Sequence, residues 1–205
     1  MNEHTDLLLT RPSMIQRAAS CPKHEIWSDF LTFYEPFINS ILRKMRFREP
    51  DLEDVRQQVF LKLWKQLSNY RKEDQKTKFR SWLATVIRNV AIDWLRQQKG
   101  KDVQFASEEA AQNLHLCQPE IVTMIEREWQ NHVVATAIER LKPVFSGKAF
   151  EVLRLSLAGV STEEISTRLD IRQESVYVLK SRVKSRVQQE VAQIRLEQEG
   201  GYESQ

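Results

Sequence analysis

Glycine, proline and cysteine are all scarce in this 205-residue chain, which contains five Gly, six Pro and two Cys. The small number of glycines and prolines, together with few alternating β-branched runs, favours helices over sheets. The two cysteines, Cys21 and Cys117, lie far apart in the sequence and do not form a disulfide framework. They fit a protein of a reducing compartment, so we expect an all-α fold without structural disulfides.

Long apolar segments are also lacking. No run approaches the ~18 apolar residues of a membrane span, and the leucines at 7–9 are too few for the apolar part of a signal peptide. The sequence contains neither a Gly-rich phosphate loop nor a nucleophile paired with a base. We therefore expect a soluble, cytoplasmic protein that is not an enzyme, needs no cofactor and does not insert into a membrane.

Charge is nearly balanced over the whole chain, with 31 Lys and Arg against 28 Asp and Glu, but it is unevenly distributed. Residues 78–101 hold six basic residues against Asp93 alone, and residues 171–190 hold five against two. Between them, residues 102–128 hold six acidic residues against Arg127 alone. The basic segments predict surfaces for a polyanion, and the acidic segment predicts a linker.

The length and the 41% content of hydrophobic residues predict two small helical domains. We expect a loosely ordered arm at residues 1–25 and a first helical domain at 26–100. A flexible acidic linker at 101–125 would lead to a helix-turn-helix domain at 126–190, and a frayed tail would follow at 191–205.

Three helices are predicted for the first domain from the spacing of its apolar residues. The first begins near Ile26, and Pro36 should kink it or open its second half. The second begins near Asp51, residues 68–78 form a loop, and the third follows over residues 78–99. On this third helix, Ile92 and Leu95 fall beside arginines on the face opposite the core, which predicts an exposed apolar patch where something docks.

The helix from Asp51 also carries a mixed stripe opposite its core. The members of this stripe follow i, i+3, i+4, i+7 and i+11 spacing and are Asp54, Gln57, Gln58, Leu61 and Lys65. A helix of a partner protein would suit this surface. An ordinary solvated face is the alternative, and the periodicity alone favours it.

The second domain contains a helix-turn-helix pattern. Ser161 and Glu164 form a capping box at a helix start, residues 170–172 form a turn, and a basic helix follows. On that helix we expect Gln173, Glu174 and Tyr177 to contact base edges in a major groove. Further contacts are expected from Ser181, Arg182 and Lys184. A solvated surface helix is the alternative.

The segments DLEDVRQQVFLKLWK and FRSWLATVIRNVAIDWLRQQK resemble the first conserved domain of bacterial RNA polymerase sigma factors of the extracytoplasmic-function (ECF) group. The second domain is similar to their C-terminal helix-turn-helix, so the resemblance covers about residues 26–190. It implies a sigma factor that binds core RNA polymerase and directs promoter-specific transcription initiation. By this resemblance the second domain contacts the −35 element as duplex, and the first holds the melted −10 element.

The resemblance also assigns roles to single residues. The clamp helices of the largest polymerase subunit would bind the stripe that matches the family motif, namely Asp54, Gln57, Phe60 and Leu61, with Gln58 standing where an acidic residue is usual. Asn89 matches the position that holds a flipped −10 base, with Arg88, Asp93 and Arg96 around it and Tyr70 to Lys78 as the preceding loop. Asp93 could instead pair with Asn89 or Arg96.

In the second domain, Arg172, Tyr177 and Val178 depart from the residues usual in the family. The acidic linker matches the family's connector, which is thought to thread the active-site and RNA-exit channels of the polymerase. Many members are held by an anti-sigma protein, and the sequence leaves open whether this chain has such a partner.

Two other readings remain open. A stand-alone helix-turn-helix transcription regulator would use the first domain for dimerisation or ligand sensing. A zinc protein would use Cys21, His24, His115 and Cys117, but neither half of this set has a strong metal-binding spacing, so we expect no metal.

Overall fold

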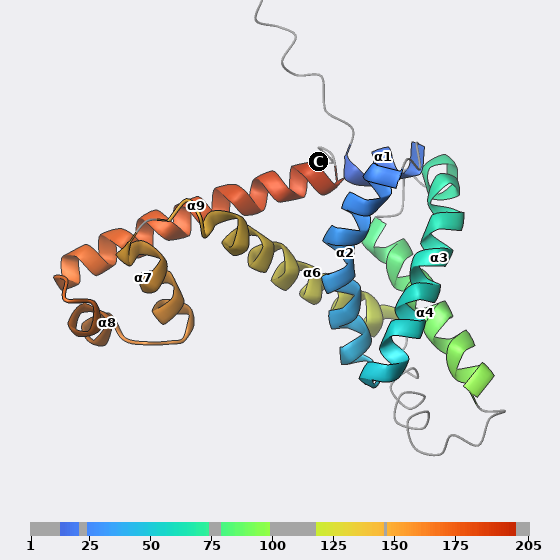
Figure 1. The fold of residues 1–205 in the computed structure, drawn as a ribbon, viewed down its shortest axis with the longest axis horizontal. Coiled ribbons are helices and arrows are strands. Elements are labelled where there is room, and N and C mark those ends of the chain that lie inside the picture. Colours follow the sequence, from blue (N-terminus) through green and yellow to red (C-terminus); the bar gives the residue numbers. More distant parts are fainter. Residues whose placement is uncertain (1–12, 21–23, 74–78, 99–117, 146, 200–205) are drawn as a thin grey trace, which may run out of the picture. The chain divides into compact units, whose positions relative to one another are not determined.

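The computed structural model describes residues 13–20, 24–73, 79–98, 118–145 and 147–199 (Figure 1). Within these ranges every regular element is an α-helix, which confirms the predicted all-α fold class. None of the helices in the described ranges is both long and apolar enough to cross a bilayer. Contacts divide the chain into a first unit, Met1–His132 with Glu197–Gln205, and a second unit, Val133–Leu196.

The first unit is built on three long helices, α2 (His24–Lys44), α3 (Glu49–Glu73) and α4 (Phe79–Gln98). Their facing sides carry fully buried apolar residues at the spacing that the sequence predicts, including Phe37, Val59 and Ile87. Helix α2 runs through Pro36 as one continuous element. The three-helix core therefore follows from the apolar periodicity.

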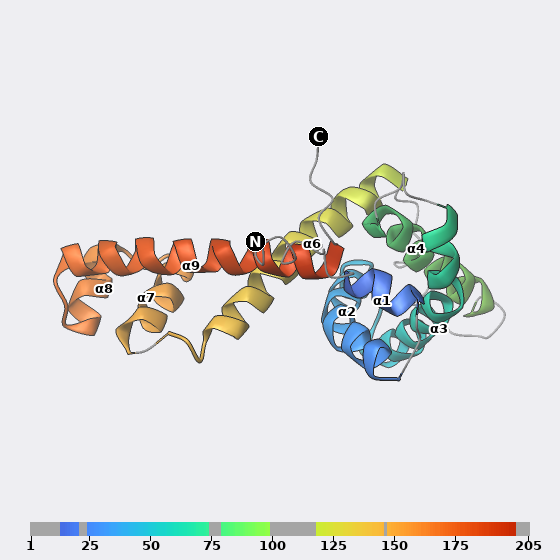
Figure 2. The same ribbon diagram turned by 90° about the horizontal axis from the view of Figure 1, so that it is seen from above.

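A short helix, α1 (Met14–Ser20), lies within the arm that we expected to be loosely ordered. Ser13 and Gln16 cap it reciprocally: the Gln16 backbone N–H donates to Ser13 Oγ at 3.1 Å, and the Ser13 N–H donates to Gln16 Oε1 at 3.0 Å. Ile15 and Ala18 are buried, and α1 packs against α2 and α3 (Figure 2). The expectation for residues 14–20 was therefore wrong.

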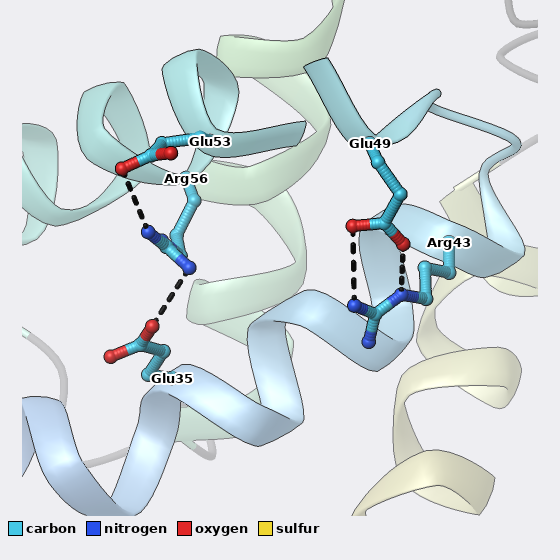
Figure 3. A network of polar contacts seen from close by, with 5 residues as sticks. All are labelled: Glu35, Arg43, Glu49, Glu53 and Arg56. Atoms are coloured by element: carbon cyan, nitrogen blue, oxygen red, sulfur yellow. Dashed lines mark hydrogen bonds and ion pairs between the residues drawn. The ribbon is translucent and has the colours of Figure 1, made fainter. Parts of the chain in front are cut away.

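The link between α2 and α3 is closed by a Schellman-type turn and an ion pair. Arg46 adopts a left-handed conformation (φ 64°), and the Phe47 N–H donates to the Leu42 carbonyl at 3.1 Å. Across the turn, Arg43 Nε donates to Glu49 Oε1 at 2.8 Å (Figure 3). This bond raises the pKa of Arg43 and lowers the pKa of Glu49.

A second ion pair, between Arg56 of α3 and Glu35 of α2, links the two helices further along. Arg56 Nη1 lies 2.7 Å from Glu35 Oε1, and Arg56 Nη2 lies 3.4 Å from Glu53 Oε1 (Figure 3). The Arg56 side chain is largely covered, so this bridge is less screened by water than an exposed pair. The two bridges link α2 and α3 at two points, beside a register that the buried apolar residues determine.

Two further expectations for α3 and α4 were wrong. Helix α3 continues to Glu73, so residues 68–73 are helical rather than part of a loop; residues 74–78 lie outside the described ranges. Leu95 is buried, although we placed it on the exposed face of its helix. Ile92 is half-buried, so the predicted apolar patch of these two residues does not form.

Helix α6 (Gln118–Leu141) begins inside the range predicted as linker, and its first half packs in the first unit. Trp129 is buried against the rings of Tyr34 and Phe37. Arg80 Nε donates to Glu126 Oε2 at 2.6 Å, and its guanidinium lies 5.4 Å from the Trp129 ring centroid. Ser40 Oγ donates to the buried Glu128 carboxylate. Two acidic residues counted toward the predicted linker charge therefore have partners in the first unit.

The second unit consists of the C-terminal half of α6 with α7 (Lys148–Leu157), α8 (Thr162–Leu169) and most of α9 (Gln173–Glu199). Its core is a cluster of Val152, Leu155, Ile165 and Val176, which joins α7 and α8 to the start of α9 (Figure 1). Helix α9 continues through 191–199, where we expected a frayed tail; residues 200–205 lie outside the described ranges.

The connection from α8 to α9 is short and well bonded. The Glu164 N–H donates to Ser161 Oγ at 3.2 Å, as the predicted capping box requires, but the Glu164 carboxylate pairs with Arg168 at 2.5 Å instead of reaching back. Asp170 adopts a left-handed conformation (φ 49°), and the Ile171 N–H donates to the Ser166 carbonyl at 3.1 Å. This turn directs α9 away from α8 while both contribute to the same core.

Candidate functional site

A hollow of about 470 Å³ lies between α3 and α4 and collects most of the residues predicted around Asn89. This volume falls within the range of ligand pockets, ~300–1,000 Å³. The members of this α3/α4 hollow are Lys62 and Gln66 from α3 and Trp82, Thr85, Val86, Arg88, Asn89, Ile92, Asp93 and Arg96 from α4. The lining thus combines one aromatic and two aliphatic side chains with polar ones, of which three are basic and one is acidic.

Asn89 and Arg88 offer different hydrogen-bonding groups to this hollow. Asn89 is exposed, and its amide can both donate and accept, as recognition of a base edge requires. Arg88 is half-buried, and its Nε is covered without a hydrogen-bond partner among the described residues. A buried donor without a partner costs free energy, so a ligand that accepts from Arg88 would be favoured.

Asp93 and Arg96 lie one turn apart at the same rim. Asp93 Oδ1 is 3.6 Å from Arg96 Nη1, and both side chains are well exposed. The structure thus contains the pairing with Arg96 that was one alternative for Asp93. An exposed pair of this kind contributes little to stability, so Arg96 can exchange its partner for a phosphate at small cost.

Trp82, the aromatic member of the hollow, packs against two further rings. The ring of Tyr70, on α3, lies 4.9 Å from that of Trp82 and 5.5 Å from that of Phe79. Tyr70 is therefore a helical residue packed on α4, whereas the sequence analysis had predicted it as part of a loop. Lys78, the other predicted contact of this segment, lies outside the described residues.

The outer α3 face presents a second candidate surface. Asp54, Gln57 and Leu61 are exposed along it, whereas Gln58 and Phe60 are half-buried at its edges. Leu61 is 59% exposed, and Trp64, which the sequence analysis did not single out, is 43% exposed beside it. Exposed large apolar residues flanked by polar ones are typical of a protein docking surface.

The third candidate surface is the face of α9 that points away from its core. All six residues predicted for this helix are exposed, namely Gln173, Glu174, Tyr177, Ser181, Arg182 and Lys184. Val176 and Val183 are buried on the opposite side, as the periodicity predicts. Lys180, by contrast, is turned inward and donates to Thr162 Oγ1 at 2.9 Å, so it links α9 to α8.

A family comparison covers the segment that contains two of these surfaces. Residues 31–101 match the family model of sigma-70 region 2. The matched range runs from α2 to the end of α4 and contains both the α3/α4 hollow and the outer α3 face. It supports a sigma-70 family factor and a role in RNA polymerase binding and promoter melting, which is the role of an initiation factor rather than an enzyme.

The sigma-70 region 2 match covers about a third of the chain and none of the helices from α6 to α9. A search of curated proteins finds no match to this sequence. The α9 surface is therefore described by its own geometry and charge alone.

The alternative zinc site is not assembled within the described ranges. Of its four predicted ligands only His24 lies there, and the described residues contain no group of three or more His, Cys, Asp and Glu side chains placed to hold a metal.

Sequence reasoning missed Lys62 and Gln66 as members of the hollow. Both lie on α3 and reach α4 only through the packing of the two helices. The signal that could have found them is their position near the edge of the α3 core stripe, facing the basic side of α4. Ile92 was identified, but as part of an exposed patch rather than as a wall of the hollow.

Proposed function

We propose that this protein is a sigma factor of the ECF group, which binds core RNA polymerase and directs it to specific promoters. One observation carries the proposal: the segment that matches sigma-70 region 2 is also the segment that forms the α3/α4 hollow and the outer α3 face. A polymerase-bound factor that opens promoters needs both a docking surface and a site for an unpaired base.

The α3/α4 hollow would bind one base of the melted −10 element. Removing a base from the stack costs a few kcal/mol, which stacking and hydrogen bonds in a pocket offset. Asn89 would contact the base edge, and the same nucleotide would accept a hydrogen bond from Arg88, whose Nε has no partner among the described residues. Trp82, with Tyr70 behind it, offers an aromatic surface on which a base can stack.

Basic residues around the hollow would hold the strand on either side of that base. Lys62 stands on α3 and Arg96 on α4, both at the rim, and both are exposed. Contacts of this kind position the strand without recognising its sequence. Lys62 extends the predicted set of −10 contacts onto α3.

The outer α3 face would bind the clamp helices of the largest polymerase subunit. Leu61 and Trp64 supply exposed apolar area, and Asp54 and Gln57 supply polar groups two turns and one turn before Leu61, respectively. Because the hollow and this face lie on different sides of α3, one helix can contact polymerase and DNA at once. Loss of either surface should therefore leave the other intact.

The second unit would contact the −35 element as duplex through α9, with α8 supporting it. In this proposal residues 26–100 form the domain for core polymerase and the −10 element, and residues 126–190 form the domain for the −35 element. Residues 101–125 would connect the two domains within the polymerase. A stand-alone regulator would need only the duplex contact, and this difference makes the two functions separable by experiment.

Reconstituted transcription tests the proposal. Purified protein and core polymerase are incubated with a promoter library, each alone and together, at a stated salt concentration because phosphate contacts dominate affinity. We expect promoter-dependent transcripts only when both are present. Tight binding of the protein alone to duplex DNA, without any promoter-dependent transcript, would instead establish a stand-alone regulator.

A further inference from the structure

The outward face of α9 carries an apolar side chain at its centre. Val178 is 65% exposed, and its neighbour Tyr177 is 61% exposed. At about 100° per residue, Glu174, Val178, Ser181 and Ser185 form one stripe directly opposite the buried Val176 and Val183. We call these four residues the α9 stripe. Val178 and the adjacent Tyr177 thus place apolar area on the outward side of a basic helix, where a bound partner would cover it.

The surroundings of the α9 stripe favour nucleic acid over protein as that partner. Arg182 and Lys184 flank it, both exposed and neither in an ion pair among the described residues. Arg172, just before the helix, is exposed as well. Cations on both sides of a helix face complement the two phosphate backbones that border a major groove.

Val178 also lies near the N-terminal end of α9, which is the end that contacts bases in a helix-turn-helix. It falls in the second turn of α9, and in a helix-turn-helix the N-terminal residues of the second helix reach the base edges. Glu174 precedes it by one turn on the same line, so the two side chains are neighbours on the surface. Both are exposed and free to meet adjacent base pairs.

The chemistry of these two side chains selects different bases. Among the groups in the major groove, only the C5-methyl of thymine gives a valine an apolar contact, because the remaining edges are hydrogen-bond donors and acceptors. A carboxylate accepts from the N4 amino group of cytosine and is repelled by the N7 and O6 acceptors of guanine. Resting on the proposed function, we propose that Val178 recognises a thymine methyl and Glu174 a nearby cytosine in the −35 element.

The experiment starts from the upstream element selected by the full-length protein with core polymerase. Each thymine of that element is replaced in turn by deoxyuracil, which removes only the C5-methyl group. We expect one position at which holoenzyme binding weakens roughly threefold to fivefold, the size expected for one buried methyl group. With Val178→Ala the same replacement should have no effect, because the methyl contact is already lost.

A matched control is available in the same unit. Val144 is 58% exposed and lies outside α9, so Val144→Ala should keep the full sensitivity to deoxyuracil. Glu174→Ala should reduce the preference for cytosine at a neighbouring position by roughly fivefold or more. Both altered side chains on α9 are exposed, so the variants should melt at the native temperature.

The outcomes separate this inference from the proposed function. If the holoenzyme selects a promoter but no thymine is sensitive to loss of its methyl, the assignment of Val178 is wrong and the proposed function stands. The assignment also fails if Val178→Ala keeps the sensitivity, or if it weakens binding to core polymerase and leaves promoter selection unchanged. If no promoter is selected at all, the proposed function itself fails.

Discussion

Basic residues line the α3/α4 hollow and flank the α9 stripe, but the two surfaces differ in shape and in the exposure of their hydrogen-bonding groups. The hollow is concave, includes the ring of Trp82 and contains an Arg88 Nε that is covered and has no partner among the described residues. The α9 stripe is the outer line of a helix, with every member exposed. A concave site with covered hydrogen-bonding groups suits a single base taken out of the stack, whereas a protruding line suits the groove of a duplex.

Asn89→Ala should give the largest effect and separates the two surfaces. Loss of a base-edge contact should weaken binding of the holoenzyme to a single-stranded −10 oligonucleotide by roughly 10-fold to 100-fold. Binding to an upstream −35 duplex and to core polymerase should not change, as measured by fluorescence anisotropy. Asn131→Ala, at an exposed position of α6, is the matched control. Loss of core binding by Asn89→Ala would show that the faces are assigned wrongly.

Leu61→Ala should have the next largest effect, and this effect should be the same at every promoter. Removing an apolar side chain that becomes buried in an interface weakens association by roughly tenfold or more, so core polymerase binding should fall equally whichever promoter is present. Leu157, 65% exposed in the second unit, provides the control substitution Leu157→Ala. A promoter-dependent defect from Leu61→Ala would place DNA, rather than polymerase, on the outer α3 face.

Arg182→Ala should have a smaller effect that does not depend on sequence. If Arg182 contacts a phosphate beside the α9 stripe, its loss should weaken duplex binding uniformly across promoters and lower the salt slope of binding by about one. Holoenzyme binding to duplexes of different sequence is measured over a series of salt concentrations. A change of base preference with an unaltered slope would move Arg182 from the phosphates to the bases.

The smallest effect expected is a pH dependence confined to the first unit. Burial against Phe33 and Phe37 lowers the pKa of His132, only partly opposed by a hydrogen bond with the Phe33 backbone. The unfolded chain therefore binds more protons, and the free energy of unfolding should fall as the pH drops below about 6.5 towards the folded pKa. Urea unfolding followed by tryptophan fluorescence measures this, and His132→Gln should flatten the profile. If His132→Gln kept the same dependence of unfolding free energy on pH, His132 would not be its cause.

The sequence predicted the long helices because their cores repeat over many turns, and it placed Asn89, Arg88 and Leu61 on accessible faces for the same reason. The sequence-based prediction was wrong where the exposure of a residue was inferred from its own helix alone. Leu95 lies at the edge of the α4 core stripe, so a helical wheel alone did not show that a neighbour covers it. The polar end of α3 was read as a loop because solvated helix turns and loops share a composition.

Other features were present in the sequence but were not used. Ser13 and Gln16 have the spacing of a capping box, which identifies the start of α1. The contributions of Lys62 and Gln66 to the hollow depend on the packing of α3 against α4, which no single-helix pattern contains. The exposed faces of single helices were therefore predictable, and the lining of the hollow between two helices was predicted only in part.

Photocrosslinking in the open promoter complex tests most directly the claim that the two surfaces bind different forms of DNA. A photoreactive amino acid is placed at Ile92, in the wall of the hollow, or at Ser185, on the α9 stripe, and the crosslinked nucleotides are mapped. The account predicts that position 92 crosslinks to one strand of the melted −10 element and position 185 to the −35 duplex. Crosslinks from position 92 to duplex DNA, or from position 185 to the melted strand, would contradict it.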